Sequence, residues 1–359
     1  MSDQQQHHGD HGPETHRHGG HDQQQHHSGQ RPETHGHGGH DQQPGGGHGD
    51  QSGGGGNGDQ SGGGGNGHQS GGGGHHHGHT SDMDWNTMGE ALERRAAVYT
   101  PVYDQIIADL RARTPRPARI IDAGSGPGAV SVRLAEAFPE AEVVAVDGGE
   151  ALLERAAARF ERARLAPRAR THLAELPDGL GALGPADVIW LGQSLHHIGD
   201  QRAALAAFAK HLAPGGVLVL LEGGLPARHL PRDIGIGRPG LEVRVDAARE
   251  NWFAEMRTSL PGAKAETEDW AALLASAGLT HAATRSYLLD LPAPLDDLAR
   301  AHVANFFGQL GEAFAERLDA DDLATVARLV DPADEASVLC RPDIFVLTAQ
   351  TVHMAVRAD

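Results

Sequence analysis

The sequence is poor in cysteine and contains no long apolar run. Cys340 is the only cysteine among 359 residues, so no disulfide can form within the chain. No apolar stretch reaches the roughly 18 residues that a membrane span requires. The first residues also lack the basic-then-apolar pattern of a secretory signal. These absences predict a cytoplasmic protein with no membrane partner.

Basic residues are scarce as well. The chain carries 30 Lys and Arg against 48 Asp and Glu, which gives a formal net charge of −18. A nucleic-acid partner requires a basic surface for its phosphates. The charge therefore argues against a nucleic-acid partner, and it leaves the oligomeric state open.

Residues 1–84 have almost no large apolar side chain. The segment PETHRHGGHDQQ at 13–24 returns as PETHGHGGHDQQ at 32–43, and Gly/Ser repeats follow. Such a composition cannot bury enough apolar surface to offset chain entropy, so we expect a disordered tail. Seventeen of the 25 histidines lie before residue 80. They indicate either weak binding of Ni or Zn or a simple repeat expansion, with no single metal site.

Residues 85–359 alternate between helical and strand patterns, which predicts one α/β domain with a parallel sheet. A helix is expected at 100–113. The expected strands lie at 118–124, 142–147, 168–173, 186–193, 216–222, 286–291 and 344–356. Two longer connections, at about 224–265 and 292–340, are expected to form a cover over the substrate. In the second, Val303, Phe307, Leu310 and Phe314 form one apolar helical face.

The motif IIDAGSGPGAVS at 120–131 reads as a strand, a glycine-rich turn and the start of a helix. Gly124, Gly126 and Gly128 let the backbone adopt left-handed dihedrals and approach a ligand closely. Asp147 ends the next strand, where a carboxylate can accept hydrogen bonds from two ribose hydroxyls. The motif therefore predicts a nucleoside-containing cofactor.

Two kinds of cofactor suit this arrangement, because GSGPGA also satisfies the dinucleotide pattern G-x-G-x-x-G/A. Asp122 distinguishes between these two kinds of cofactor. It lies two residues before Gly124, and a buried anion there would repel a pyrophosphate. S-adenosylmethionine carries a sulfonium and an ammonium but no phosphate, so Asp122 favours it over a nicotinamide dinucleotide.

Over residues 117–223 the sequence resembles the class I S-adenosylmethionine-dependent methyltransferases. The resemblance rests on D-x-G-x-G-x-G, on AVD at the second strand, on DVIWLGQSLHHI and on LAPGGVLVL. It implies a Rossmann-like seven-stranded sheet of order 3-2-1-4-5-7-6 with the last strand antiparallel. It also implies that the cofactor site comprises Asp122, Gly124, Gly126, Gly128, Asp147, Gly148, His172, Leu173 and Gln193. His172 departs from the family, which often has an acid at that position.

The resemblance implies methyl transfer to an unidentified small organic acceptor by in-line displacement. His197 is a candidate general base and Glu222 closes the fifth strand nearby. A structural role for the LHH segment remains the alternative for His197. Two other functions remain open: a nicotinamide-dependent oxidoreductase, and a metal-binding protein that acts through its tail. Trp252, Phe253, Phe306 and Phe307 are expected either in the core or on an apolar substrate wall.

Overall fold

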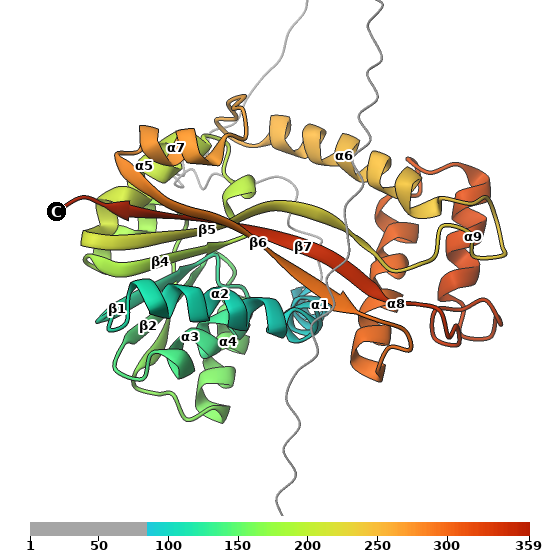
Figure 1. Ribbon diagram of the computed structural model, residues 1–359, viewed down its shortest axis with the longest axis horizontal. Coiled ribbons are helices and arrows are strands. Elements are labelled where there is room, and N and C mark those ends of the chain that lie inside the picture. Colours follow the sequence, from blue (N-terminus) through green and yellow to red (C-terminus); the bar gives the residue numbers. More distant parts are fainter. Residues whose placement is uncertain (1–84) are drawn as a thin grey trace, which may run out of the picture. The chain divides into compact units, whose positions relative to one another are not determined.

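The computed structural model describes residues 85–359, which contain one seven-stranded mixed sheet (Figure 1). In sheet order its strands are β3 (Ala169–Leu173), β2 (Glu142–Asp147), β1 (Arg119–Ala123), β4 (Ala186–Gly192), β5 (Leu212–Arg228), β7 (Val346–Arg357) and β6 (Leu279–Leu291). The first five run parallel, whereas β7 is antiparallel to both neighbours. The predicted order is confirmed. The expectations for residues 1–84, including disorder and the binding of Ni or Zn, lie outside the described residues.

The central strands are apolar on both faces because helices cover both. Successive residues of a strand point to opposite faces, and Ile120 and Ile121 of β1 belong to different buried clusters. Val188 and Ile189 of β4 divide in the same way. Continuous apolar runs of this kind are typical of parallel strands.

The helices form a layer on each face of the sheet. One layer comprises α2 (Thr100–Arg113), α3 (Ala129–Ala137) and α4 (Glu150–Arg162), and the other comprises α5 (Gln201–His211) and α7 (Trp270–Ser276). Two short 3₁₀ helices, η1 (Asp178–Ala182) and η2 (Leu195–His197), lie in the connections next to β4. Within residues 85–359, no helix is both long and apolar enough to cross a membrane.

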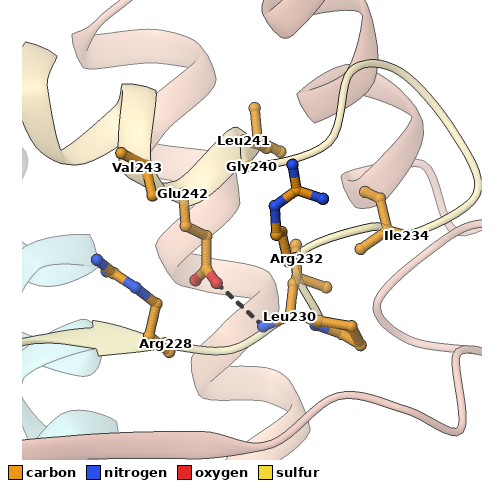
Figure 2. A pocket seen from close by; sticks show the side chains of 9 residues that line it. Arg228, Leu230, Arg232, Ile234, Gly240, Leu241, Glu242 and Val243 are labelled. Atoms are coloured by element: carbon orange, nitrogen blue, oxygen red, sulfur yellow. Dashed lines mark hydrogen bonds between the residues drawn. The ribbon is translucent and has the colours of Figure 1, made fainter.

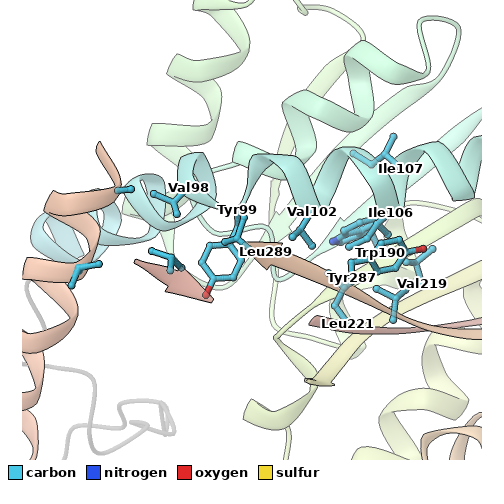
Figure 3. Close-up of a cluster of buried hydrophobic side chains, with 14 of the residues drawn as sticks. Val98, Tyr99, Val102, Ile106, Ile107, Trp190, Val219, Leu221, Tyr287 and Leu289 are labelled. Atoms are coloured by element: carbon cyan, nitrogen blue, oxygen red, sulfur yellow. The ribbon is translucent and has the colours of Figure 1, made fainter. Parts of the chain in front are cut away.

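The cluster beneath α2 joins the parallel strands to the antiparallel edge (Figure 3). Trp190 of β4 is 1% exposed and Ile106 of α2 is fully buried. Tyr287 of β6 packs in the same cluster, and its hydroxyl donates a 2.5 Å hydrogen bond to Asp109 on α2. Helix α2 thus packs against both the parallel strands and the antiparallel edge of the sheet.

Strands β5, β6 and β7 continue well beyond the parallel part of the sheet, toward a group of three helices (Figure 1). These helices are α6 (Leu241–Ser259), α8 (Asp297–Ala313) and α9 (Ala320–Val330). Val303, Phe307, Leu310 and Phe314 are each at most 9% exposed. The predicted apolar face of this segment is therefore confirmed as buried.

Several local boundaries differ from the sequence expectations. Helix α1 (Trp85–Val98) was not expected, because its sequence carries few large apolar residues. Helix α6 begins at Leu241, directly after Gly240 with its φ of +81°, whereas the sequence pattern predicts a start near Asp246. The sequence pattern also predicts Thr267 as the N-cap of the next helix, and this prediction is wrong. Asp269 accepts from the backbone N–H of Ala272 at 3.0 Å, and so α7 begins at Trp270.

Candidate cofactor and acceptor site

The turn after β1 requires glycine for steric as well as conformational reasons. Gly124 and Gly128 have φ values of +75° and +71°. A Cβ atom on Gly124 would lie 2.5 Å from Cβ of Ser194, and one on Gly128 would lie 2.7 Å from Cβ of Ala156. Both contacts are far below van der Waals separation, so helix α4 and the segment that follows β4 pack directly against the turn.

Asp147 at the end of β2 fixes the shape of this turn. Its Oδ2 accepts from the backbone N–H of Gly126 at 2.8 Å, and its Oδ1 accepts from the N–H of Gly149 at 2.9 Å. A carboxylate has about four acceptor positions. Asp147 therefore keeps lone pairs that can accept hydrogen bonds from ribose hydroxyls while it holds both loops.

Next to Asp147 the structure brings together Gly148, Leu173 and Glu175. The Leu173 side chain is 54% exposed although it is apolar. A Cβ atom on Gly148 would lie 3.0 Å from Oε1 of Glu175. The Nε2 atom of His172 is instead 3.2 Å from the carbonyl oxygen of Gly179 in η1. Glu175 is thus an acid beside the expected adenine position that the sequence analysis missed, although it lies only three residues after His172.

Asp122 lies beneath the turn and not at its open side. It is 3% exposed, and its Oδ2 accepts a 2.5 Å hydrogen bond from the Ser131 hydroxyl on α3. Burial raises the pKa of Asp122 to about 7, and the nearby charge of Asp147 adds to this rise while the bond from Ser131 opposes it. A cation bound nearby would favour the ionised form of this carboxyl group.

Gln193, directly after β4, has an unusual backbone conformation. Its φ of +54° is uncommon for a residue other than glycine. Its N–H donates to the carbonyl oxygen of Leu221 at 3.1 Å, and its side-chain oxygen accepts a hydrogen bond from the Arg95 guanidinium. The guanidinium carbon also lies 5.2 Å from the centre of the Tyr99 ring. Sequence reasoning identified Gln193 but missed Arg95 and Tyr99, because nothing in the sequence connects them to β4.

The two histidines of η2 take different partners. The Nδ1 atom of His196 lies 3.0 Å from Oε2 of Glu222, which is 6% exposed. The rings of His197 and His196 lie against each other at a tilt of 47°, with centres 4.3 Å apart. Desolvation by its neighbours, followed by the charge of His196, lowers the pKa of His197 to about 4, although part of the residue remains exposed. Glu222 thus pairs with His196, and His197 is neutral at pH 7.

Three helices meet above this edge of the sheet. Leu92 of α1 is the nearest neighbour of Gly126, 3.8 Å from a Cβ placed there, and Glu93 is 3.1 Å from Arg159 of α4. From the other side, Arg257 of α6 donates to the carbonyl oxygens of His196 and Ile198 at 2.8 and 2.7 Å. Helix α8 packs against α1. Both long connections are therefore tied to the end of β4, α6 directly and α8 through α1.

A surface cavity lies farther out, at the start of α6 (Figure 2). Its empty volume is about 460 Å³ with the open solvent at its mouth included, and Arg228, Leu230, Arg232 and Glu242 contribute to its wall. In Figure 2 the Glu242 carboxylate points between Arg228 and Leu230, and it accepts from the N–H of Leu230 at 3.1 Å. Glu242 thus lines this cavity while its carboxylate is held by the backbone at the end of β5.

The residues at the inner edge fit S-adenosylmethionine in three respects. The space beside Gly126 is nearly open, so a ligand can lie against the turn. Asp147 retains acceptor positions for ribose hydroxyls, and the exposed Leu173 side chain offers an apolar surface for the adenine ring. No basic side chain hydrogen-bonds this turn within the described residues, except that Arg159 donates to the carbonyl oxygen of Pro127. This donor set suits a ribose and a cation better than a pyrophosphate.

Comparison with known proteins agrees with this geometry. Residues 121–218 match the family model described as a methyltransferase domain. A trans-aconitate 2-methyltransferase of Variovorax paradoxus is 34% identical over 38% of this chain and 49% of its own length. One from Methylobacterium nodulans is 29% identical over 62% of this chain and 89% of its own. An O-methyltransferase family protein from Burkholderia thailandensis has a TM-score of 0.43 at 16% identity, over 77% of this chain and 60% of its own.

Proposed function

We propose, from the premise that this chain is a class I S-adenosylmethionine-dependent methyltransferase, that it methylates a small organic acid. The observation that supports an acid is Arg95. Its guanidinium is held by Gln193 at the end of β4, where the methyl group of the cofactor is expected. A fixed cation at this position stabilises an anionic acceptor. The methyltransferase match also disfavours the oxidoreductase alternative.

When bound, S-adenosylmethionine supplies a methyl group on a positively charged sulfur, which is ready for in-line displacement. The chain contributes alignment. Asp147 and the glycine turn hold the ribose side, Gly148 and Leu173 hold the adenine side, and Gln193 with Arg95 orients the acceptor. Holding two reactants in line removes most of the entropic cost of their encounter. The α6 and α8 connections, 224–265 and 292–340, would exclude water from this space.

The two relatives named as trans-aconitate 2-methyltransferases support the same acceptor class, because trans-aconitate is a small organic acid. This chain spans about half the length of the first of these relatives. An organic acid as its acceptor is therefore our proposal. A carboxylate is already ionised at neutral pH and needs no general base. A site without a general base agrees with the position of Glu222, whose carboxylate is paired with His196 and is not free to accept a proton from the acceptor.

A hydroxyl acceptor is the second candidate, and His197 favours it. A neutral imidazole can take the proton that a hydroxyl group loses on methylation. With a pKa of about 4, however, His197 is a weak base, and within the described residues its ring makes no side-chain hydrogen bond. The carboxylate acceptor is therefore the better supported of the two.

The test is a methyl-transfer assay with labelled S-adenosylmethionine and a panel of organic acids that includes trans-aconitate. We expect labelled methyl esters, a rate little changed by His197→Ala, and loss of transfer when Asp147 is replaced. Methylation of hydroxyl compounds only, with a large loss in His197→Ala, would support the second candidate. No transfer to any acid would overturn the proposal.

A further inference from the structure

His229, which directly follows β5, has a side chain that is 1% exposed. Its Nδ1 lies 3.0 Å from Oε1 of Glu242, and the backbone N–H groups of His229 and Leu230 donate to the same carboxylate at 2.9 and 3.1 Å. An ionised carboxylate can only accept hydrogen bonds. Nδ1 therefore carries a proton, and in the tautomer that this contact selects Nε2 is the ring nitrogen with a lone pair.

This Nε2 atom has no hydrogen-bond partner among the described residues, although it is buried. Such an unpaired buried group is costly and is rarely left without a function or a ligand. Three aromatic rings pack near the His229 ring. The centres of Phe306, Phe307 and His302 lie 4.5, 5.9 and 6.3 Å from that of His229. A flat molecule with a hydrogen-bond donor would pack against these rings and would donate a hydrogen bond to Nε2.

A series of side chains connects His229 to the methyl end of the site. Gln193 bonds to Arg95, and Arg95 lies over the ring of Tyr99. The ring centres of Tyr99 and His302 are 6.0 Å apart, and His302 faces His229. The series therefore runs from the end of β4 through Tyr99 to His302 of α8.

The register of the sheet shows how far apart the two ends are. Leu221, which accepts from the N–H of Gln193, pairs with Val352, and Arg228 pairs with Leu347. Five residues of an antiparallel strand span roughly 17 Å. His229 therefore lies at the far end of this series from Gln193, and a molecule that reaches it from the methyl end must be elongated.

We propose that His229 binds the distal end of an elongated, planar acceptor, with Nε2 accepting a hydrogen bond from a hydroxyl or N–H group there. Glu242 is a positioning residue that fixes the ring and its tautomer. This inference rests on the proposed function and adds the acceptor class: a flat acid whose carboxylate lies near Arg95 and whose hydroxyl group lies near His229.

The test compares two probes that differ by one hydroxyl group. Full-length protein saturated with S-adenosylhomocysteine is titrated calorimetrically with 4-hydroxycinnamate and with cinnamate. We expect the hydroxylated probe to bind about tenfold more tightly, as one buried hydrogen bond warrants. His229→Phe should abolish the preference, whereas His229→Gln should restore part of it through the amide oxygen. His281→Phe, at an exposed histidine of β6, is the matched control and should keep the full preference.

The inference is overturned if wild-type protein binds both probes equally, binds neither, or keeps its preference in His229→Phe with an unchanged melting temperature. Failure of the proposed function has a different outcome. In that case the methyl-transfer assay shows no ester with any acid, whatever the binding preference. Conversely, ester formation on cinnamate at an undiminished rate in His229→Phe is expected, because cinnamate has no group for Nε2 to bind.

Discussion

The inner region, residues 119–193, and the outer region, residues 224–340, use different interactions to build a site. In the inner region the cofactor turn is held through backbone groups: Asp147 accepts from two backbone N–H groups, and Gly124 allows Ser194, just after β4, to approach. In the outer region the contacts are made by side chains. Arg244, for example, donates two hydrogen bonds of 2.7 and 2.8 Å to the carboxylate of the buried Asp322.

This difference separates a general function from an individual one. A site built from backbone accepts the same cofactor in any sequence that keeps the turn. A site built from side chains changes with each substitution, so it can be specific for one acceptor. We therefore expect inner-region variants to change cofactor affinity and outer-region variants to change stability and acceptor choice.

The largest effect is expected in the core of the outer region. Phe307 is fully buried, so Phe307→Ala should lower the free energy of unfolding by about 3–5 kcal/mol in urea titrations. Trp252→Ala removes a ring that is 40% exposed and should cost about 1 kcal/mol or less. Affinity for S-adenosylhomocysteine should be nearly unchanged in both. A parallel loss of affinity in Phe307→Ala would show that the two regions are not separable.

Asp122→Asn should change the pH dependence of stability. The pKa of Asp122 is raised to about 7 in the folded protein, so between about pH 4 and 7 the residue ionises in the unfolded chain but stays protonated in the folded one. The free energy of unfolding therefore falls progressively as the pH rises through this range. A shift of about 3 units corresponds to roughly 4 kcal/mol. The variant should lack this loss in chemical denaturation at pH 4, 6 and 8 without cofactor. Asp104→Asn, at an exposed ion pair, is the control. Identical pH profiles of Asp122→Asn and wild type would contradict the buried charge.

Asp147→Ala should weaken cofactor binding by about 1.5–3 kcal/mol, because charge-assisted hydrogen bonds to the ribose and the order of the loop are lost together. Calorimetry with S-adenosylhomocysteine measures this loss. NADH titrated into the wild-type protein is the second measurement, and we expect no binding. Equal affinity for NADH would refute the choice of cofactor.

The smallest of these effects tests the boundary between the regions. Arg95→Ala should raise KM for the acid acceptor about tenfold, by roughly 1.4 kcal/mol, and leave the Kd of S-adenosylhomocysteine within about twofold. Arg94→Ala, on the neighbouring position of α1, should change neither. If the Kd of S-adenosylhomocysteine rises as much as KM, Arg95 binds the carboxylate of the cofactor and not that of the acceptor.

The inner region could be predicted because its signals are local. Each apolar run of β1, β2 and β4, the spacing of the glycines and the position of Asp147 at the end of its strand can be recognised within a short stretch of sequence. Strand order and the antiparallel β7 followed from the resemblance. Glu175 was missed because its approach to Gly148 depends on the turn after β3, which no periodicity describes.

The outer region could be predicted as helices but not as a site. The apolar face of α8 was evident from its spacing, whereas the pairing of His229 with Glu242 joins two elements of different type. Arg95 and Gln193 lie 98 residues apart and meet only through the packing of α1. The roles of His197, Glu222 and the other predicted site residues stay predictions.

The position of β7 between β5 and β6 has a consequence for how the chain folds. During synthesis β6 leaves the ribosome before β7, yet within the described sheet β7 is its only strand partner. Strand β5 likewise has one open side until β7 arrives. A nascent chain therefore carries two unpaired edges while α8 and α9 are made, which is the condition under which strands pair wrongly with other chains. The non-local contacts of β7 make its insertion a slow step that closes the sheet.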